Sequence, residues 1–168
     1  SMSGSQSQVL YTPEQRARRD ATRWTLVQGI LAPVQFFVFL LSLYLVVNSL
    51  KTGENTDWAL ISVVIKTVVL YAIMITGAIW EKVVFGKYLF APAFFWEDVV
   101  STLVMVLHTA YLWVWWEGKW SADEQLLLAL TAYTTYAINA AQYIRKLRMA
   151  RLQKPLQHSP ASGAQVSL

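Results

Sequence analysis

Cysteine is absent from this chain of 168 residues, and charged residues make up only 14% of it. The lack of cysteine excludes a disulfide framework, thiol catalysis and thiolate metal sites. The low share of charge argues against a soluble domain, in which about a quarter of the residues are charged. The sequence also lacks a nucleotide fingerprint, a nucleic-acid module, metal-ligand spacing and transporter-like internal repeats. We therefore expect no nucleic-acid partner and no protein-bound metal.

Apolar residues make up 55% of the chain and lie in long blocks rather than in amphipathic stripes. Each block is close to the ~20 residues that an α-helix needs to cross a bilayer. Tryptophans lie mostly at the ends of the blocks, as they do at membrane interfaces. These patterns predict an all-α, integral membrane four-helix bundle. The expected spans are residues 24–50, 58–80, 97–116 and 124–144.

Lysine and arginine are distributed unevenly among the polar segments. Eleven of them lie in the N-terminal arm, the connector 81–96 and the C-terminal tail, whereas the loops 51–57 and 117–123 hold only two. Cytoplasmic loops of membrane proteins carry the excess of positive charge. We therefore expect the connector and both the N- and C-termini to be cytoplasmic.

The chain is expected to comprise three parts. These are a cytoplasmic N-terminal arm at residues 1–23, a four-helix transmembrane domain at 24–147 and a flexible cytoplasmic tail at 148–168. In the arm, Thr12 is predicted to cap a short helix that begins with Pro13. The tail is basic and then rich in proline, serine and glutamine, which favours disorder.

Ionisable residues at membrane depth are costly, so each one is a candidate functional residue. Glu97 and Asp98 open the third span, and Glu81 ends the second on the same side of the membrane. Three carboxyl groups close together can form a proton-donating cluster, because neighbouring negative charge and a low dielectric favour the protonated form. In the alternative interpretation, Glu97 and Asp98 only stabilise the start of their helix through its dipole and free amides.

Three further polar residues lie inside the expected spans. His108 shares a face of the third span with Glu97 at roughly 16 Å along the axis, so the two could contact opposite ends of one flat ligand. Alternatively, His108 is a hydrogen-bonded packing residue. Lys66 either snorkels or pairs structurally, or it binds an anion. Asn139 belongs to a polar stripe that either holds helices together or lines a cavity.

A resemblance to a known family is carried by four stretches of the chain, residues 10–33, 80–98, 107–112 and 136–142. The second of them reads WEKVVFGKYLFAPAFFWED. Together they resemble the 3-vinyl bacteriochlorophyllide hydratases. The resemblance implies a hydro-lyase that adds water to the C3-vinyl group of a chlorophyllide-type macrocycle, giving a 1-hydroxyethyl group in bacteriochlorophyll a biosynthesis. It also implies a multi-pass protein of the bacterial inner membrane, which is either the cytoplasmic membrane or an intracytoplasmic photosynthetic membrane. The resemblance implies no cofactor beyond the magnesium of the substrate.

Hydration of the vinyl group would begin with a proton on its terminal carbon, followed by water at the inner carbon. We expect Glu97 or Asp98 to be the acid, with Glu81 assisting the water or the cation. Because Glu97 and Asp98 differ by ~100° around the helix, only one is expected to face the substrate. The candidate substrate-binding residues are His108, Lys87, Lys66, Trp80, Trp96 and Asn139. His108 is also a candidate ligand of the substrate's magnesium, and the tryptophans have interfacial anchoring as their simpler role.

The expected partners are the tetrapyrrole substrate and the lipid bilayer, together with other pathway enzymes or a second copy of the chain. Two other functions are compatible with a polar membrane interior. A non-catalytic pigment-binding or carrier protein needs only a magnesium ligand and apolar walls, so the acidic cluster argues against it. A small channel or transporter is disfavoured by the uncharged first span and the lack of repeats.

Overall fold

The structure is a computed structural model, and it describes residues 9–158. The described residues are all-helical, as predicted. In chain order the elements are α1 (Pro13–Ala21), α2 (Arg23–Thr52), α3 (Thr56–Phe85), the short 3-10 helix η1 (Pro92–Phe94), α4 (Phe95–Glu117) and α5 (Ala122–His158).

Three helical segments within residues 9–158 are long and apolar enough to cross a membrane: α2, α3 and Pro92–Glu117. α5 is longer but less apolar, because it is rich in alanine and threonine and its last part is basic. The side chains that the three apolar segments turn outward are themselves apolar; Leu26, Ile75 and Val106 are all exposed. An apolar outer surface is what helices in lipid present. The fourth span lies within α5 and stays a prediction.

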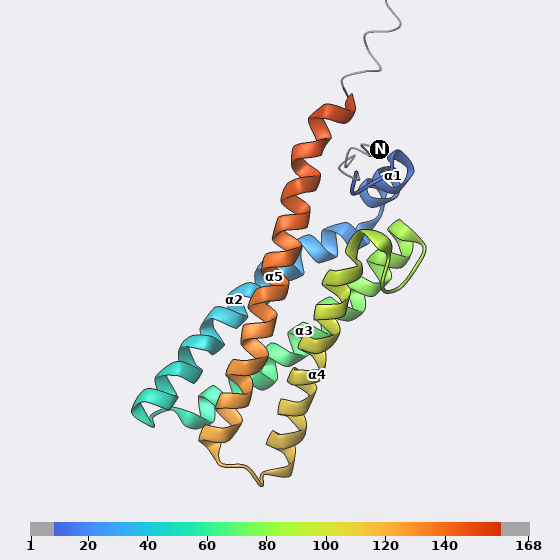
Figure 1. The fold of residues 1–168 in the computed structure, drawn as a ribbon. Coiled ribbons are helices and arrows are strands. Elements are labelled where there is room, and N and C mark those ends of the chain that lie inside the picture. The colour runs from blue at the N-terminus through green and yellow to red at the C-terminus, as the bar shows by residue number, and fades with distance from the viewer. Residues whose placement is uncertain (1–8, 159–168) are drawn as a thin grey trace, which may run out of the picture.

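The four long helices form two hairpins (Figure 1). α2 packs mainly on α3 and α4 packs mainly on α5, whereas the contacts between the two hairpins are fewer. Because the chain runs up and down, α1, the turn between α3 and α4 and the last turns of α5 all lie at one end of the molecule (Figure 1). We call this end the connector end.

The local sequence explains where several helices begin and end. The Thr12 hydroxyl accepts a hydrogen bond from the Gln15 amide, and the Gln15 side chain accepts one from the Thr12 amide. This capping box confirms the predicted cap, with Pro13 in the first turn of α1. Gly86 caps the end of α3 and Gly118 caps the end of α4; both have positive φ, a conformation that glycine adopts without strain.

The N-terminal arm is held against the connector end of the bundle. Tyr11 is buried and stacks on Phe85 of α3. The Leu10 amide donates a hydrogen bond to Gln153 Oε1 of α5 at 3.2 Å. Arg18 Nε donates to a backbone carbonyl of α3 at 3.1 Å. These contacts place the arm over the ends of α3 and α5.

Two element boundaries differ from the prediction. α3 continues to Phe85, so the connector is shorter than expected. α5 continues to His158, so the segment 148–168, predicted to be a flexible tail, begins as a helix. Alanine, leucine, methionine and arginine favour helix there, and Ala150 packs against Tyr11 of the arm. The remainder of that tail and the first residues of the arm lie outside the described residues.

Candidate functional site

Three carboxyl groups are buried together at the connector end. Glu81 comes from near the end of α3, and Glu97 and Asp98 come from the first turn of α4. The exposed fractions of these three residues are 4%, 6% and 5%. The angle between Glu97 and Asp98 around the helix predicted that only one would face the substrate, yet the structure buries both. We call these three residues the carboxyl cluster.

Asp98 is the best-anchored member of the carboxyl cluster. Its Oδ2 accepts a hydrogen bond from the Phe90 amide at 2.8 Å, and its Oδ1 accepts one from the Tyr143 hydroxyl at 3.0 Å. Phe90 adopts a left-handed conformation with φ of 62°, which is uncommon and costly for a residue other than glycine. The turn between α3 and α4 thus holds a strained residue whose amide is bonded to the carboxylate.

Glu81 contacts Asp98 side chain to side chain. Its Oε1 accepts a hydrogen bond from the Ala91 amide at 2.9 Å. Two carboxyl groups in contact repel each other strongly if both are ionised, so such pairs share one proton. Glu81 Oε1 and both oxygens of Asp98 already accept hydrogen bonds, so the second oxygen of Glu81 is the one left for the contact within the pair.

Glu97 lies in a different environment from the Glu81–Asp98 pair. Its Oε1 is 3.6 Å from Lys146 Nζ, and Lys146 also donates a hydrogen bond to the Ala93 carbonyl at 2.6 Å. Glu97 Oε2 is buried and has no hydrogen-bond partner among the described residues. A buried acceptor without a partner is costly. This oxygen is therefore free to accept a bond from water or from a ligand.

Asn139 and Ser101 join α4 to α5 next to the carboxyl cluster. Asn139 Nδ2 donates a hydrogen bond to the Glu97 carbonyl at 3.0 Å, and the Ser101 hydroxyl donates one to Asn139 Oδ1 at 2.8 Å. Both side chains are buried. These bonds favour the interhelical role among the two interpretations of the polar stripe, with Asn139 fixing the backbone from which Glu97 projects.

A groove of about 380 Å³ opens beside the carboxyl cluster, between the arm, the connector and α5. It is lined by Val9, Leu10, Gln15, Phe85, Pro92, Ala93 and Lys146. Its exposed lining is about as polar as it is apolar, and Lys146 links it to Glu97. The groove therefore lacks the predominantly apolar walls that are typical of a small-molecule site.

Three predicted substrate-binding residues lie around the carboxyl cluster rather than in it. Trp80 is half-buried, its Nε1 donates a hydrogen bond to Thr25 Oγ1 at 2.9 Å, and its ring meets Phe94 edge-on. Trp96 and Lys87 are exposed. Contact of these residues with the substrate stays a prediction.

His108 and Lys66 form a second buried polar group, away from the carboxyl cluster. Lys66 Nζ lies 2.9 Å from His108 Nε2, and His108 Nδ1 lies 2.7 Å from the Val104 carbonyl. Lys66 is fully buried, so it does not snorkel. His108 follows Asp98 by ten residues, or ~15 Å along α4, so the two groups do not touch. Both ring nitrogens of His108 are occupied, and ligation of the substrate's magnesium would require Lys66 to move.

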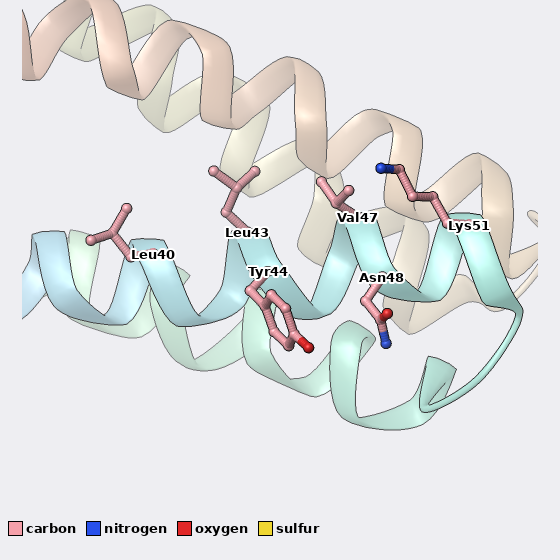
Figure 2. A pocket seen from close by; sticks show the side chains of 6 residues that line it. All are labelled: Leu40, Leu43, Tyr44, Val47, Asn48 and Lys51. Carbon is pink, nitrogen blue, oxygen red and sulfur yellow. The ribbon is translucent and has the colours of Figure 1, made fainter.

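A further groove lies on the outward face of α2, near the end of the helix that is far from the connector. Figure 2 shows its lining, which comes from α2 alone: Leu40, Leu43, Tyr44, Val47, Asn48 and Lys51. Its volume is about 370 Å³. It contains none of the predicted site residues, and its apolar side chains are typical of a surface that faces lipid.

Tyr143 and Lys146 are site residues that the sequence did not predict. They follow Asn139 by four and seven residues, so the helical period alone places all three on one face of α5. No sequence pattern predicts that the backbone amides of Phe90 and Ala91 bind the carboxyl groups, because the direction of these amides depends on the conformation of the turn. Within residues 9–158, no group of three or more histidines and acidic residues is arranged to hold a metal ion.

Comparison with known proteins gives a consistent result. The model of the 2-vinyl bacteriochlorophyllide hydratase family matches residues 11–149 of this chain. The protein named 2-vinyl bacteriochlorophyllide hydratase in Rhodobacter capsulatus is 64% identical over 145 residues, covering 86% of this chain and 84% of the relative. The protein of the same name in Cereibacter sphaeroides is 66% identical over 143 residues, covering 85% and 89%. No solved structure matches the chain significantly. The chain therefore belongs to the 2-vinyl bacteriochlorophyllide hydratase family, which its four characteristic stretches had predicted.

Proposed function

We propose that this chain is a hydratase of bacteriochlorophyll biosynthesis, as its relatives are named. It adds water to a vinyl group on a bacteriochlorophyllide-type macrocycle and gives a 1-hydroxyethyl group. The vinyl group that the relatives' names number 2 is the C3-vinyl group of the sequence-based prediction. One observation supports this chemistry above the others: Glu81, Glu97 and Asp98 are all buried at the connector end, where Glu81 contacts Asp98 and the Oε2 of Glu97 has no hydrogen-bond partner among the described residues.

The first step is protonation of the terminal vinyl carbon. The Glu81–Asp98 pair supplies the proton, because two carboxyl groups in contact retain one proton inside a low-dielectric site. The new C–H bond uses the vinyl π electrons and leaves a cation on the inner carbon, which the macrocycle delocalises. Loss of the shared proton leaves both carboxyl groups of the pair ionised, and the cation that forms next to them offsets their mutual repulsion and is stabilised by their charge.

The second step is addition of water to the inner carbon. Glu97 is suited to be the base, because its buried Oε2 is without a partner and can accept a hydrogen bond from the attacking water. The water oxygen forms a bond to carbon and its proton passes to Glu97. One proton leaves the pair and one arrives at Glu97, so the addition is balanced. Because hydration requires no electron acceptor or donor, we propose that no redox cofactor takes part.

The purified protein tests the proposed reaction directly. Incubated with a vinyl pigment and no cofactor, it should yield a product heavier by one water. Glu97→Gln and Asp98→Asn should each slow the conversion by a factor of about 100 or more, which is the usual contribution of an acid or base. Glu54→Gln, which changes an exposed loop carboxylate, is the matched control and should convert at the wild-type rate. Binding of pigment without conversion by the wild type would show a carrier instead.

We also propose that α5 is the fourth span and that both termini face the cytoplasm of a bacterial inner membrane. The excess of basic residues in the arm, connector and tail supports this orientation. The common location of these segments at the connector end is compatible with it (Figure 1).

The absence of native cysteine makes this topology easy to test. Single cysteines are introduced in turn at Lys87 in the connector and at Lys119 between α4 and α5. A membrane-impermeant maleimide added to intact cells should label the variant at Lys119 and leave the variant at Lys87 unlabelled until the cells are broken. Labelling of the Lys87 position from outside would reverse the orientation.

A further inference from the structure

We infer that Lys66 is a second anchor for the substrate, at which an oxygen atom on the far edge of the macrocycle accepts a hydrogen bond from the buried amino group. This inference rests on the proposed function, because it takes the ligand to be a bacteriochlorophyllide-type macrocycle. It concerns a part of the bundle that the two chemical steps above do not use.

The hydrogen bonds of His108 determine what Lys66 can do. The Val104 carbonyl only accepts hydrogen bonds, so His108 Nδ1 carries the ring proton and donates it at 2.7 Å. His108 Nε2 is then an acceptor, and the contact of 2.9 Å is a hydrogen bond donated by Lys66. The amino group of a lysine carries at least two N–H donors. At least one donor of Lys66 is therefore left for another partner.

The surroundings of Lys66 are aromatic rather than acidic. Its Nζ lies 3.6 Å from the ring centroid of Tyr136, 5.2 Å from that of Tyr133 and 5.9 Å from that of Phe39. Among the described residues, Lys66 has no carboxylate within ion-pairing distance. Ring faces are weak hydrogen-bond acceptors and compensate only part of the cost of burying an amino group. Such a group inside a membrane domain marks a binding site for an electronegative partner.

A buried polar side chain without a hydrogen-bond partner among the described residues lies one helical turn from Phe39 on α2. Gln35 precedes Phe39 by four residues on α2 and has an exposed fraction of only 1%. Neither its amide nitrogen nor its carbonyl oxygen has a hydrogen-bond partner among the described residues. Lys66 lies where the two hairpins meet. It comes from α3 of one hairpin, and its neighbours come from α2 (Phe39), α4 (His108) and α5 (Tyr133 and Tyr136). The hairpins contact each other less than their own helices do.

The spacing of the two polar groups fits one large flat ligand. Asp98 and His108 are ~15 Å apart along α4, a distance on the scale of the macrocycle itself. Neither of the grooves described above is lined by Lys66 or His108, so a macrocycle with its vinyl group at the carboxyl cluster turns its opposite edge toward Lys66 only when the two hairpins part to admit it. The oxygen acceptors of a bacteriochlorophyllide include the ketone of the ring fused opposite the vinyl-bearing ring and the free carboxylate on the neighbouring ring.

The experiment measures binding and not turnover. The probe is a pigment with an ethyl group in place of the vinyl group, which cannot be hydrated. Lys66→Met retains the length of the side chain and removes the amino group, and Lys51→Met, at the exposed end of α2, is the matched control. Lys66→Met should weaken binding at least tenfold, the effect of losing one hydrogen bond to a charged group. Lys51→Met should bind like the wild type.

Two modified pigments identify the oxygen. One has the ketone reduced to an alcohol, and the other has the carboxylate converted to its methyl ester. If the ketone is the partner, its stretching frequency in the resonance Raman spectrum of the wild-type complex is lower than in solution, and Lys66→Met returns it to the solution value. If the carboxylate is the partner, the ketone band stays unshifted, and the ester binds the wild type at least tenfold more weakly than the free acid does.

The inference is overturned if the wild type binds all three pigments equally with an unshifted ketone band. It is also overturned if folded Lys66→Met, judged by circular dichroism, binds the ethyl pigment as tightly as the wild type. The wild-type comparison needs no variant, so an unfolded Lys66→Met leaves the test valid. Loss of binding in Lys66→Met together with full activity of the carboxyl variants would refute the proposed acid and base while leaving this anchor in place.

Discussion

Replacing Glu81 by glutamine separates the acid role of the Glu81–Asp98 pair from its structural role. The side-chain oxygen of glutamine can still accept the hydrogen bond from the Ala91 amide, which is 2.9 Å long in the wild type. The amide NH₂ can still donate to Asp98. The variant therefore retains the contacts of the pair and lacks only the transferable proton. We expect the free energy of unfolding to change by less than about 1 kcal/mol, the net value of a single hydrogen bond.

The expected loss of rate is much larger than the loss of stability. A positioned general acid contributes a factor of about 10² to 10⁴, which corresponds to about 3 to 5 kcal/mol of activation free energy at 1.36 kcal/mol per factor of ten. The assay is a single turnover with protein in excess over the vinyl pigment, followed by mass spectrometry of the hydrated product. Excess protein makes the observed rate independent of product release.

A second substitution provides the structural comparison. Glu81→Leu cannot accept the bond from the Ala91 amide, and it should cost about 1 to 3 kcal/mol of stability for the buried donor left without a partner. If Glu81→Gln converts pigment within tenfold of the wild-type rate, the proton does not come from the Glu81–Asp98 pair and the proposed acid is wrong.

Three further predictions concern residues that support the carboxyl cluster. Tyr143→Phe removes the donor to Asp98 Oδ1; we expect a loss of about 1 to 3 kcal/mol in thermal or denaturant unfolding, and an unchanged stability would contradict the hydrogen bond. Lys146→Met removes the cation beside Glu97 and should slow single turnover by tenfold or more, whereas Lys119→Met, which changes an exposed lysine between α4 and α5, should leave the rate unchanged; equal rates in both variants would contradict a role for the Lys146–Glu97 pair. Tyr11→Ala removes a buried ring, which costs about 3 kcal/mol of docking energy, so trypsin should cleave the arm faster than in the wild type while helix content stays the same.

Long apolar blocks made the helices predictable. The expected spans at 24–50, 58–80 and 97–116 lie inside α2, α3 and α4, because a continuous apolar run can satisfy its backbone only as helix in lipid. The burial of Glu81 beside Asp98 could also have been predicted from the sequence. A carboxylate at the end of one helix and another at the start of the next come to the same level when the connection is short.

The remaining details depend on information that the sequence does not carry locally. The donors to Asp98 include the Phe90 amide, whose direction depends on a strained backbone turn. The pairing of Lys66 with His108 joins different hairpins, and no helical period predicts which residues meet across that seam. α5 extends beyond the expected tail boundary, and there Ala150 is buried in one cluster with Tyr11 of the arm and Val84 of α3. Local composition does not reveal such a tertiary contact.

Hydration in heavy water tests the central claim most directly. If an exchangeable carboxyl proton is delivered to the terminal vinyl carbon, the wild-type product formed in D₂O carries one deuterium on the methyl carbon of its 1-hydroxyethyl group, as read by mass spectrometry and NMR. The Glu81→Gln variant should form this labelled product at least a hundredfold more slowly. A methyl group without deuterium, or deuterium bound to the inner carbon, would contradict the mechanism.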